Sequence, residues 1–182
     1  MAKLVSKTYG EALFELAMEE NKAQLLMEEV KAVQGLLKEN VEFDKLMKHP
    51  GITKQEKVQV MHNVFKGRVS DELTGFLEIV VSKERYAELG AIFDYFIAKV
   101  KEVSRIGVAY VTSAVELSES QKNSVRLRLL ETTSYRTMEM HYSVDPSLIG
   151  GMVIRVNDRV VDSSIQTKLN ELTKQLLNIQ LG

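Results

Sequence analysis

The chain has 182 residues, a hydrophobic fraction of 45%, no cysteine, and a net charge of −1 from 24 basic and 25 acidic residues. Nucleic-acid-binding proteins typically have an excess of basic residues, which this chain does not have, so we expect no nucleic-acid partner. The absence of cysteine excludes disulfides, thiolate nucleophiles and cysteine-ligated metals, and no apolar run is long enough to insert directly into a membrane.

We expect no targeting segment in the first residues. Met1 to Lys7 lack the apolar stretch of a signal peptide, and the acidic Glu11 disfavours an organellar transit peptide. This pattern favours a bacterial source, although an organellar protein whose presequence has been removed would show the same start.

Apolar residues recur at helical spacing from residue 5 to residue 103 and predict about six helices. Pro50 ends the third helix near His49, because the residue before a proline disfavours helix. Thr53 and Glu56 form a capping-box pattern for the fourth helix, and Ser70 is a suitable cap for the fifth. The stripes run through Val5–Ala17, Leu26–Leu37, Phe43–Met47, Val58–Phe65, Leu73–Val81 and Tyr86–Val103.

The period changes to two near Ser104, which predicts strands in the remaining chain. A capping box at Ser118 opens one helix between the first two strands, and Asp162 precedes a last helix that we expect to pack against the sheet. The segments are strands at 106–111, 137–144 and 152–156, a further short strand at Val160–Val161, and a last helix with a stripe of Ile165, Leu169, Leu172, Leu176 and Ile179.

These patterns predict an α+β protein with two domains. Residues 1–104 form an N-terminal six-helix bundle, and residues 105–182 form a small C-terminal domain with β-α-β-β-α order. No flexible linker separates them, since the sixth helix runs nearly into the first strand.

No pattern of residues predicts a catalytic, cofactor or metal site. His49, His62 and His141 do not have metal-ligand spacing, and His141 takes the outward register of its strand. The pair Gly150–Gly151 precedes a strand, whereas a phosphate cradle needs glycines that open a helix. We therefore expect a structural bend at this pair.

The first and fifth helices carry more apolar residues than one face requires. The first has a stripe through Tyr9 and Leu13 and a second through Phe14 and Met18. A central helix of a bundle would bury both faces, which we favour, whereas a groove for an amphipathic partner helix would leave one side free. In the fifth helix, Ile79 adds to the same excess.

The chain resembles the delta subunit of F-type ATP synthase, called the oligomycin-sensitivity-conferring protein (OSCP) in mitochondria. The similar segments are Tyr9–Ala17, Leu46 to Ile52 with Lys57, Val144 through Asp162, and Ser163 to Ile165 with the leucines that follow. One departure is Gly10, where the family pattern favours alanine and glycine costs about 1 kcal/mol of helix propensity.

The resemblance implies a non-catalytic stator subunit without cofactors. The helical domain would bind N-terminal helices of alpha subunits in the catalytic head, and the C-terminal domain would bind the b subunits of the peripheral stalk. The complex would place the chain peripherally at the cytoplasmic face of the cell membrane, where proton transport couples to ATP synthesis. By position in the family pattern, the groove residues are Tyr9, Leu13, Phe14, Phe76, Ile79 and Val80.

Two alternatives remain open from the sequence. One is a two-domain adaptor that binds other protein clients. The other is a small enzyme whose site leaves no recognisable pattern.

Overall fold

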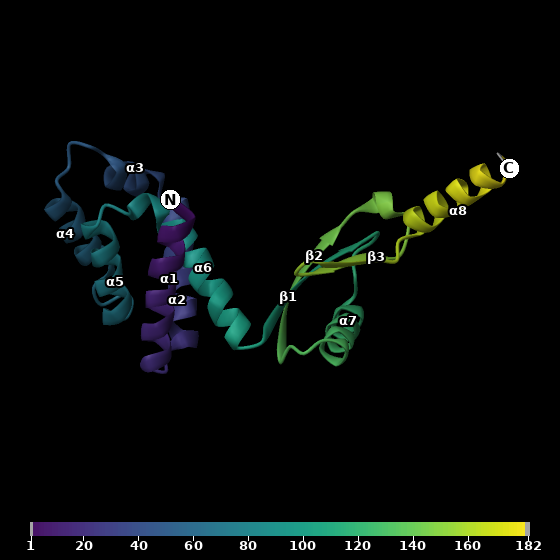
Figure 1. Ribbon diagram of the computed structural model, residues 1–182, viewed down its shortest axis with the longest axis horizontal. Helices are drawn as coiled ribbons and strands as arrows, with labels where there is room; N and C mark the ends of the chain where they lie inside the picture. Colours follow the sequence, from purple (N-terminus) through teal and green to yellow (C-terminus); the bar gives the residue numbers. More distant parts are fainter. Residues whose placement is uncertain (1, 181–182) are drawn as a thin grey trace. The chain divides into compact units, whose positions relative to one another are not determined.

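The computed structural model describes residues 2–180, with side chains for residues 4–175, and has the α+β composition expected (Figure 1). The chain divides into two compact units, Met1–Val100 and Lys101–Gly182. The boundary expected from the sequence, between residues 104 and 105, falls slightly later. No helix in the described range is long and apolar enough to cross a membrane.

Helices account for the regular structure of the first unit. Helix α3 ends at Lys48, and extended backbone at His49 leads into Pro50. Thr53 and Glu56 form the full capping box at the start of α4. The helices are α1 (Ala2–Glu19), α2 (Ala23–Glu39), α3 (Val41–Lys48), α4 (Lys54–Phe65), α5 (Asp71–Ser82) and α6 (Leu89–Val103), with the short 3-10 helix η1 (Tyr86–Glu88) before α6.

Gly10 allows α1 to approach α6 closely. A Cβ atom at this position would lie 2.5 Å from Cδ1 of Tyr95 and 3.3 Å from the carbonyl oxygen of Ile92. Glycine therefore replaces alanine at this position for a packing reason, and the close approach outweighs the helix propensity that glycine costs. The fully buried side chains of this unit include Leu13, Leu26, Val30, Leu77, Phe93 and Phe96.

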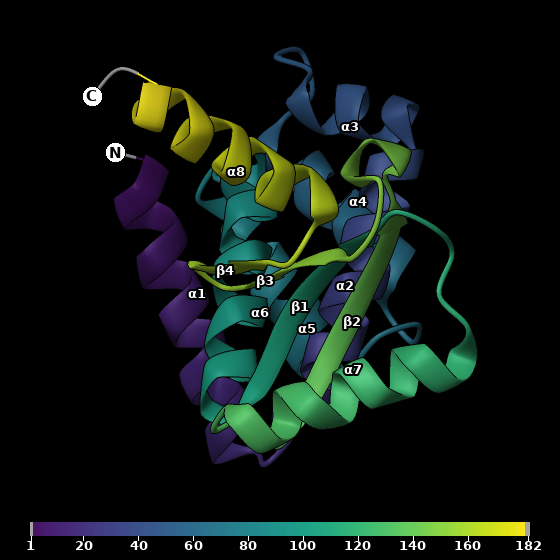
Figure 2. The same cartoon turned by 90° about the vertical axis from the view of Figure 1, so that its right-hand side faces the viewer.

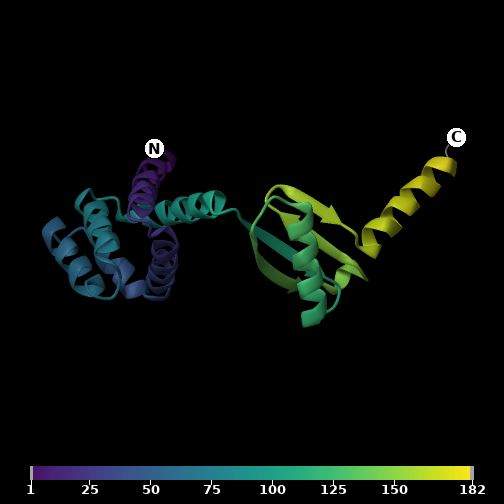
Figure 3. The same ribbon diagram turned by 90° about the horizontal axis from the view of Figure 1, so that it is seen from below.

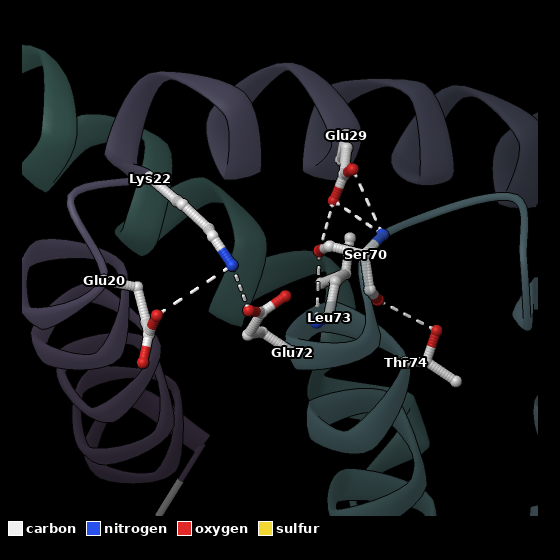
Figure 4. A network of polar contacts seen from close by, with 7 residues as sticks. All are labelled: Glu20, Lys22, Glu29, Ser70, Glu72, Leu73 and Thr74. Atoms are coloured by element: carbon white, nitrogen blue, oxygen red, sulfur yellow. Dashed lines mark hydrogen bonds and ion pairs between the residues drawn. The ribbon is translucent and has the colours of Figure 1, made fainter.

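A polar network fixes the start of α5 against α2 and the end of α1 (Figure 4). The carboxylate of Glu29 accepts hydrogen bonds from the backbone N–H of Ser70, at 3.1 Å, and from its hydroxyl, at 2.6 Å. The same hydroxyl accepts a hydrogen bond from the N–H of Leu73, so Ser70 is the predicted cap. Lys22 donates to Glu72, and this hydrogen bond lowers the pKa of the Glu72 carboxyl.

The second unit contains a four-stranded sheet with strand order β2-β1-β3-β4. Strands β1 and β2 are parallel and are joined through α7, while β3 pairs antiparallel with both β1 and β4. Its elements are β1 (Ile106–Ser113), α7 (Glu119–Thr132), β2 (Thr137–Val144), η2 (Pro146–Leu148), β3 (Met152–Val156), β4 (Arg159–Asp162) and α8 (Ile165–Gln180).

The expected β-α-β-β-α order omits β4. The short segment at Val160–Val161 is a full member of the sheet, so the observed order is β-α-β-β-β-α. All four residues of β4 are exposed. The strand therefore lacks the alternation of buried and exposed residues by which longer strands are predicted from sequence.

Helix α7 packs on one face of the sheet (Figure 2). The hydroxyl of Tyr142 donates to the carbonyl of Lys122 in α7 at 3.1 Å. Ala109, Val111 and Met138 lie on the same face and are buried.

Helix α8 extends away from the sheet (Figure 3). The expectation that it packs against the sheet is wrong for the described side chains, because Ile165, Leu169 and Leu172 are all exposed. The side chains of Leu176 and Ile179, which continue this stripe, lie outside the described residues. An amphipathic pattern predicts a helix with a face to bury, but it does not identify what covers that face.

Candidate partner-binding site

The outer face of α5 has an open strip with one exposed large apolar side chain, Ile79. Ile79 is 54% exposed, and a Cβ added at Gly75 would meet no atom within 4 Å. Glu72 lies one turn before Gly75 on the same side of the helix. Because glycine leaves the backbone uncovered, a partner helix could approach α5 closely at this point.

Three of the six groove residues predicted from the sequence belong to the core of the first unit. Leu13 and Val80 are fully buried, and Phe76 is 8% exposed at the edge of the α5 strip. Their side chains fix the position of α1 and α5, and they are not available at the surface of the isolated chain. The sequence pattern could not separate these residues from exposed neighbours, because helical stripes on both faces of a helix look alike.

The two half-buried residues on α1 lie on opposite edges of its buried face. Tyr9 and Phe14 are about 140° apart around the helix axis at 3.6 residues per turn. Gly10 contacts α6, and Glu11 accepts a hydrogen bond from Tyr95 of α6 at 2.9 Å. Phe14 lies between Gly10 and Glu11 around the helix and therefore on the α6 side, whereas Tyr9 lies on the other. The structure does not bring the six residues onto one surface.

A second apolar depression in the first unit was not singled out from the sequence. Its volume is about 300 Å³, and it lies between α2, α3 and α4. Leu36 of its lining is exposed, Phe65 forms its floor, and the cation Arg68 lies at its border. The helical stripes of the sequence do not indicate it, because its lining comes from three helices and the loop after α4.

In the second unit, an exposed apolar surface is centred on the first turns of α8. It consists of Ile165, Leu169 and Leu172, and Ile149, which precedes the glycine whose carbonyl binds the N–H of Ile165, is 63% exposed. Ile149 has φ 66° and ψ −39°, and a β-branched residue in this region is strained. The sequence predicted the helical stripe, but neither its exposure nor the backbone at Ile149.

The Gly150–Gly151 pair determines where α8 begins. Gly151 has φ +77°, and a Cβ there would lie 2.4 Å from the carbonyl oxygen of Ser163. The carbonyl of Gly150 accepts a hydrogen bond from the N–H of Ile165 at 2.9 Å. Close backbone approach is the structural role that the sequence predicted for this pair.

Asp162 completes the start of α8. One carboxylate oxygen accepts from the N–H of Ser164, and the other accepts from the hydroxyl of Thr167, both at 2.8 Å. The hydrogen bond from the Ser164 backbone is the main cause that lowers the pKa of this carboxyl. In the first turn of α8, the N–H of Thr167 donates instead to the hydroxyl of Ser164 at 3.2 Å, so Ser164 caps the helix and Asp162 binds both residues of that cap.

Each of the three histidines has its own local contact. His62 contacts Glu78 at 2.6 Å, His49 accepts from the N–H of Gly51, and His141 stacks on Tyr110. Among the residues that the structure describes, no group of three or more histidine, aspartate or glutamate residues could hold a metal ion.

Comparisons with known proteins agree with the resemblance seen in the sequence. A family model described as ATP synthase delta (OSCP) subunit matches residues 5–176. The chain is 58% identical to the ATP synthase subunit delta of Lachnoclostridium phytofermentans, with 100% of both chains covered. It is 35% identical to that of Alkaliphilus oremlandii, covering 98% of this chain and 99% of the relative.

A solved structure shares the fold. A chain in the cryo-EM structure of the Toxoplasma gondii mitochondrial ATP synthase hexamer has a TM-score of 0.72 and 20% identity, with 94% of this chain and 97% of that chain covered. The sequence matches extend through both compact units, from the first helix into α8. The chain therefore belongs to the ATP synthase delta (OSCP) subunit family.

Proposed function

We propose that this chain links the catalytic head of an F-type ATP synthase to the b subunits of its peripheral stalk. As a member of the delta family, it is a non-catalytic stator component of the complex. The family match over residues 5–176 carries this conclusion, since it includes both units and favours the stator over a general adaptor. By holding the head still, the link lets proton transport couple to ATP synthesis.

The first unit binds the N-terminal helices of alpha subunits in this proposal. The α5 strip of Glu72, Gly75 and Ile79 supplies the surface, with Phe76 at its edge. An amphipathic helix would place its apolar side on Ile79 and approach the backbone at Gly75. Tyr9 and Phe14 are on opposite edges of α1, so a single helix bound there would contact one of them.

The second unit binds the b subunits through α8. Its exposed stripe of Ile165, Leu169 and Leu172 has the spacing of a helix that packs against another helix. Ile149 extends this apolar surface at the base of α8. Burying such a stripe removes apolar area from water, and this supplies most of the driving force for association.

Binding at both ends makes modest contacts sufficient. A dissociation constant near 1 nM corresponds to about −12 kcal/mol, which an interface of roughly 1,600 Å² can supply if its centre is well packed. Once one end is bound, the other meets its partner at high effective concentration. The chain would thus be peripheral, at the cytoplasmic face of a bacterial cell membrane, within the ATP synthase complex.

The head contact is tested by titrating the full chain with a synthetic peptide of the alpha-subunit N-terminus. Ile79→Asp should weaken binding by at least about tenfold, because it places a charge in an apolar contact. Leu25→Asp, at a similarly exposed position on α2, is the matched control and should bind as the parent does. If the parent chain shows no binding at tens of micromolar, the alpha-helix assignment fails.

The place in the complex is tested separately on membranes. After washing at low ionic strength, the chain should be recovered with the head or with the stalk. Recovery only in an unrelated assembly would contradict the stator assignment.

A further inference from the structure

One face of the sheet in the second unit carries a row of planar side chains. Helix α7 occupies the face that contains Tyr142, so the neighbouring residue His141 points to the opposite face. The register pairs His141 with Tyr110, Tyr110 with Arg155, and Arg155 with Val160. One residue from each of the four strands therefore lies in a single line across this face, which we call the open sheet face.

The row is ordered by contacts between its own members. The rings of Tyr110 and His141 are stacked, with centroids 4.9 Å apart and planes 19° from parallel. On the other side of Tyr110, the guanidinium carbon of Arg155 lies 4.7 Å from the ring centroid. Side chains that are already held in place lose less conformational entropy when a partner binds.

The row remains accessible although it is ordered. Tyr110 is 46% exposed, and His141 and Arg155 are also exposed. Tyrosine and arginine are, together with tryptophan, the residues enriched where interfaces concentrate their binding energy. Val108 and Val153, on the neighbouring rows of the same face, supply half-buried apolar surface around them.

Arg155 has a positive charge that no described carboxylate neutralises. Among residues 4–175, the salt bridges do not include it, and its contact is the Tyr110 ring. The two acidic side chains on the same face are engaged elsewhere: Glu139 pairs with Lys101 at 2.5 Å, and Asp162 binds the first turn of α8. An arginine held over an aromatic ring still presents its N–H donors in a planar fork.

We propose that the open sheet face binds a carboxylate-bearing segment of the stalk polypeptide, with Arg155 donating two hydrogen bonds to an aspartate or glutamate. This inference rests on the proposed binding of the second unit to the stalk, and it adds a polar contact separate from the apolar stripe of α8. The geometry favours a carboxylate because the planar fork of arginine matches its two oxygens. The valines around the row favour apolar neighbours beside that carboxylate in the bound segment.

The test uses the full chain and the purified soluble part of the stalk polypeptide from the same synthase. Arg155→Glu should weaken binding by at least about tenfold, since a charge-assisted bond is replaced by repulsion. Arg155→Lys should bind more weakly than the parent, because lysine keeps the charge but loses the planar fork. Arg159→Glu is the matched control. Arg159 is exposed on β4, and its place in the register puts it on the opposite face of the sheet from Arg155.

A charge swap identifies the partner carboxylate. Single Glu→Lys and Asp→Lys changes along the stalk polypeptide should include one that restores binding to Arg155→Glu. The parent should also lose more affinity than Arg155→Ala when the salt concentration rises from about 50 to about 500 mM, as an exposed ion pair requires.

The outcomes separate this inference from the proposed function. If the stalk polypeptide binds the parent and all Arg155 variants equally, the open sheet face is not the site, while stalk binding stands. If Arg159→Glu weakens binding as much as Arg155→Glu, the effect is general electrostatics and the specific site is overturned. If the parent does not bind the stalk polypeptide, the proposed function of the second unit fails as well.

Discussion

Glu29 of α2 binds Ser70 at the start of α5 through both the hydroxyl, at 2.6 Å, and the backbone N–H, at 3.1 Å. Glu29→Ala should lower the free energy of unfolding by about 1–3 kcal/mol, because it leaves partly buried donors unpaired. Glu28→Ala, which removes an exposed pair with Lys31, should change it by less than about 0.5 kcal/mol. Urea unfolding of both variants measures the difference, and equal values would contradict the role of Glu29.

Gly151 should tolerate no side chain. In Gly151→Ala the new Cβ would meet the carbonyl oxygen of Ser163 in a backbone with φ +77°. We expect this change to lower the free energy of unfolding of the second unit by more than about 2 kcal/mol. Gly35→Ala, within α2 and with no atom near the new Cβ, should instead stabilise the chain by about 0.5–1 kcal/mol. Denaturant unfolding should therefore show changes of opposite sign in the free energy of unfolding for the two variants. A Gly151→Ala variant as stable as the parent would contradict the close approach of Gly151 to Ser163.

Tyr86 should ionise late. Burial, together with the charge of Asp44 and the hydrogen bond to its carboxylate, raises the pKa of Tyr86 to about 12 from its ordinary 10.0. The folded pKa is the higher one, so the stabilisation is complete below pH 10 and is lost as the pH rises towards about 12. An ultraviolet titration should show a tyrosinate step near pH 12 that disappears in Tyr86→Phe and persists in Tyr110→Phe. Loss of that step in both variants, or in neither, would contradict the assignment.

Asp162 should make the start of α8 sensitive to acid. The N–H of Ser164 is the main cause that holds the pKa of this carboxyl below 3.8, and Thr167 adds to it. The folded pKa is the lower one, so the stabilisation is present above the ordinary value and is lost as the pH falls through the folded pKa. Asp162→Asn should flatten the loss of stability below about pH 4 in urea unfolding, and Thr167→Val should flatten it less. An unchanged acid dependence in Asp162→Asn would show that this carboxylate contributes nothing.

Local patterns in the sequence predicted the boundaries of several elements. Thr53 and Ser118 open their helices with complete capping boxes, as their spacing to Glu56 and Gln121 indicates. The outward position of His141 also follows from the alternation of its strand. These features depend on neighbours three residues away or on a period of two, so the sequence contains all the information they need.

Features that depend on contacts distant in sequence could not be predicted. Leu13 and Phe14 are neighbours in α1, yet Leu13 is fully buried whereas Phe14 is half-buried at the edge of the buried face of the helix. Which side of α1 is buried depends on the helices packed around it, such as α6, whose Tyr95 lies against Gly10 although it is far along the chain. The row of Tyr110, Arg155 and His141 likewise needs the register of three strands, which periodicity within one strand cannot give.

The way α8 is joined to the sheet also determines how a mechanical pull on it would travel. Although α8 follows the edge strand β4, the N–H of Ser163 donates to the carbonyl of Met152 at 3.0 Å and that of Ile165 to Gly150 at 2.9 Å. Both acceptors belong to the chain entering β3, which is paired on its two sides. Tension on α8 is therefore divided between the covalent chain through β4 and a direct path into the sheet interior. For a stator that resists rotation, this shared path spares the edge strand from carrying the whole force.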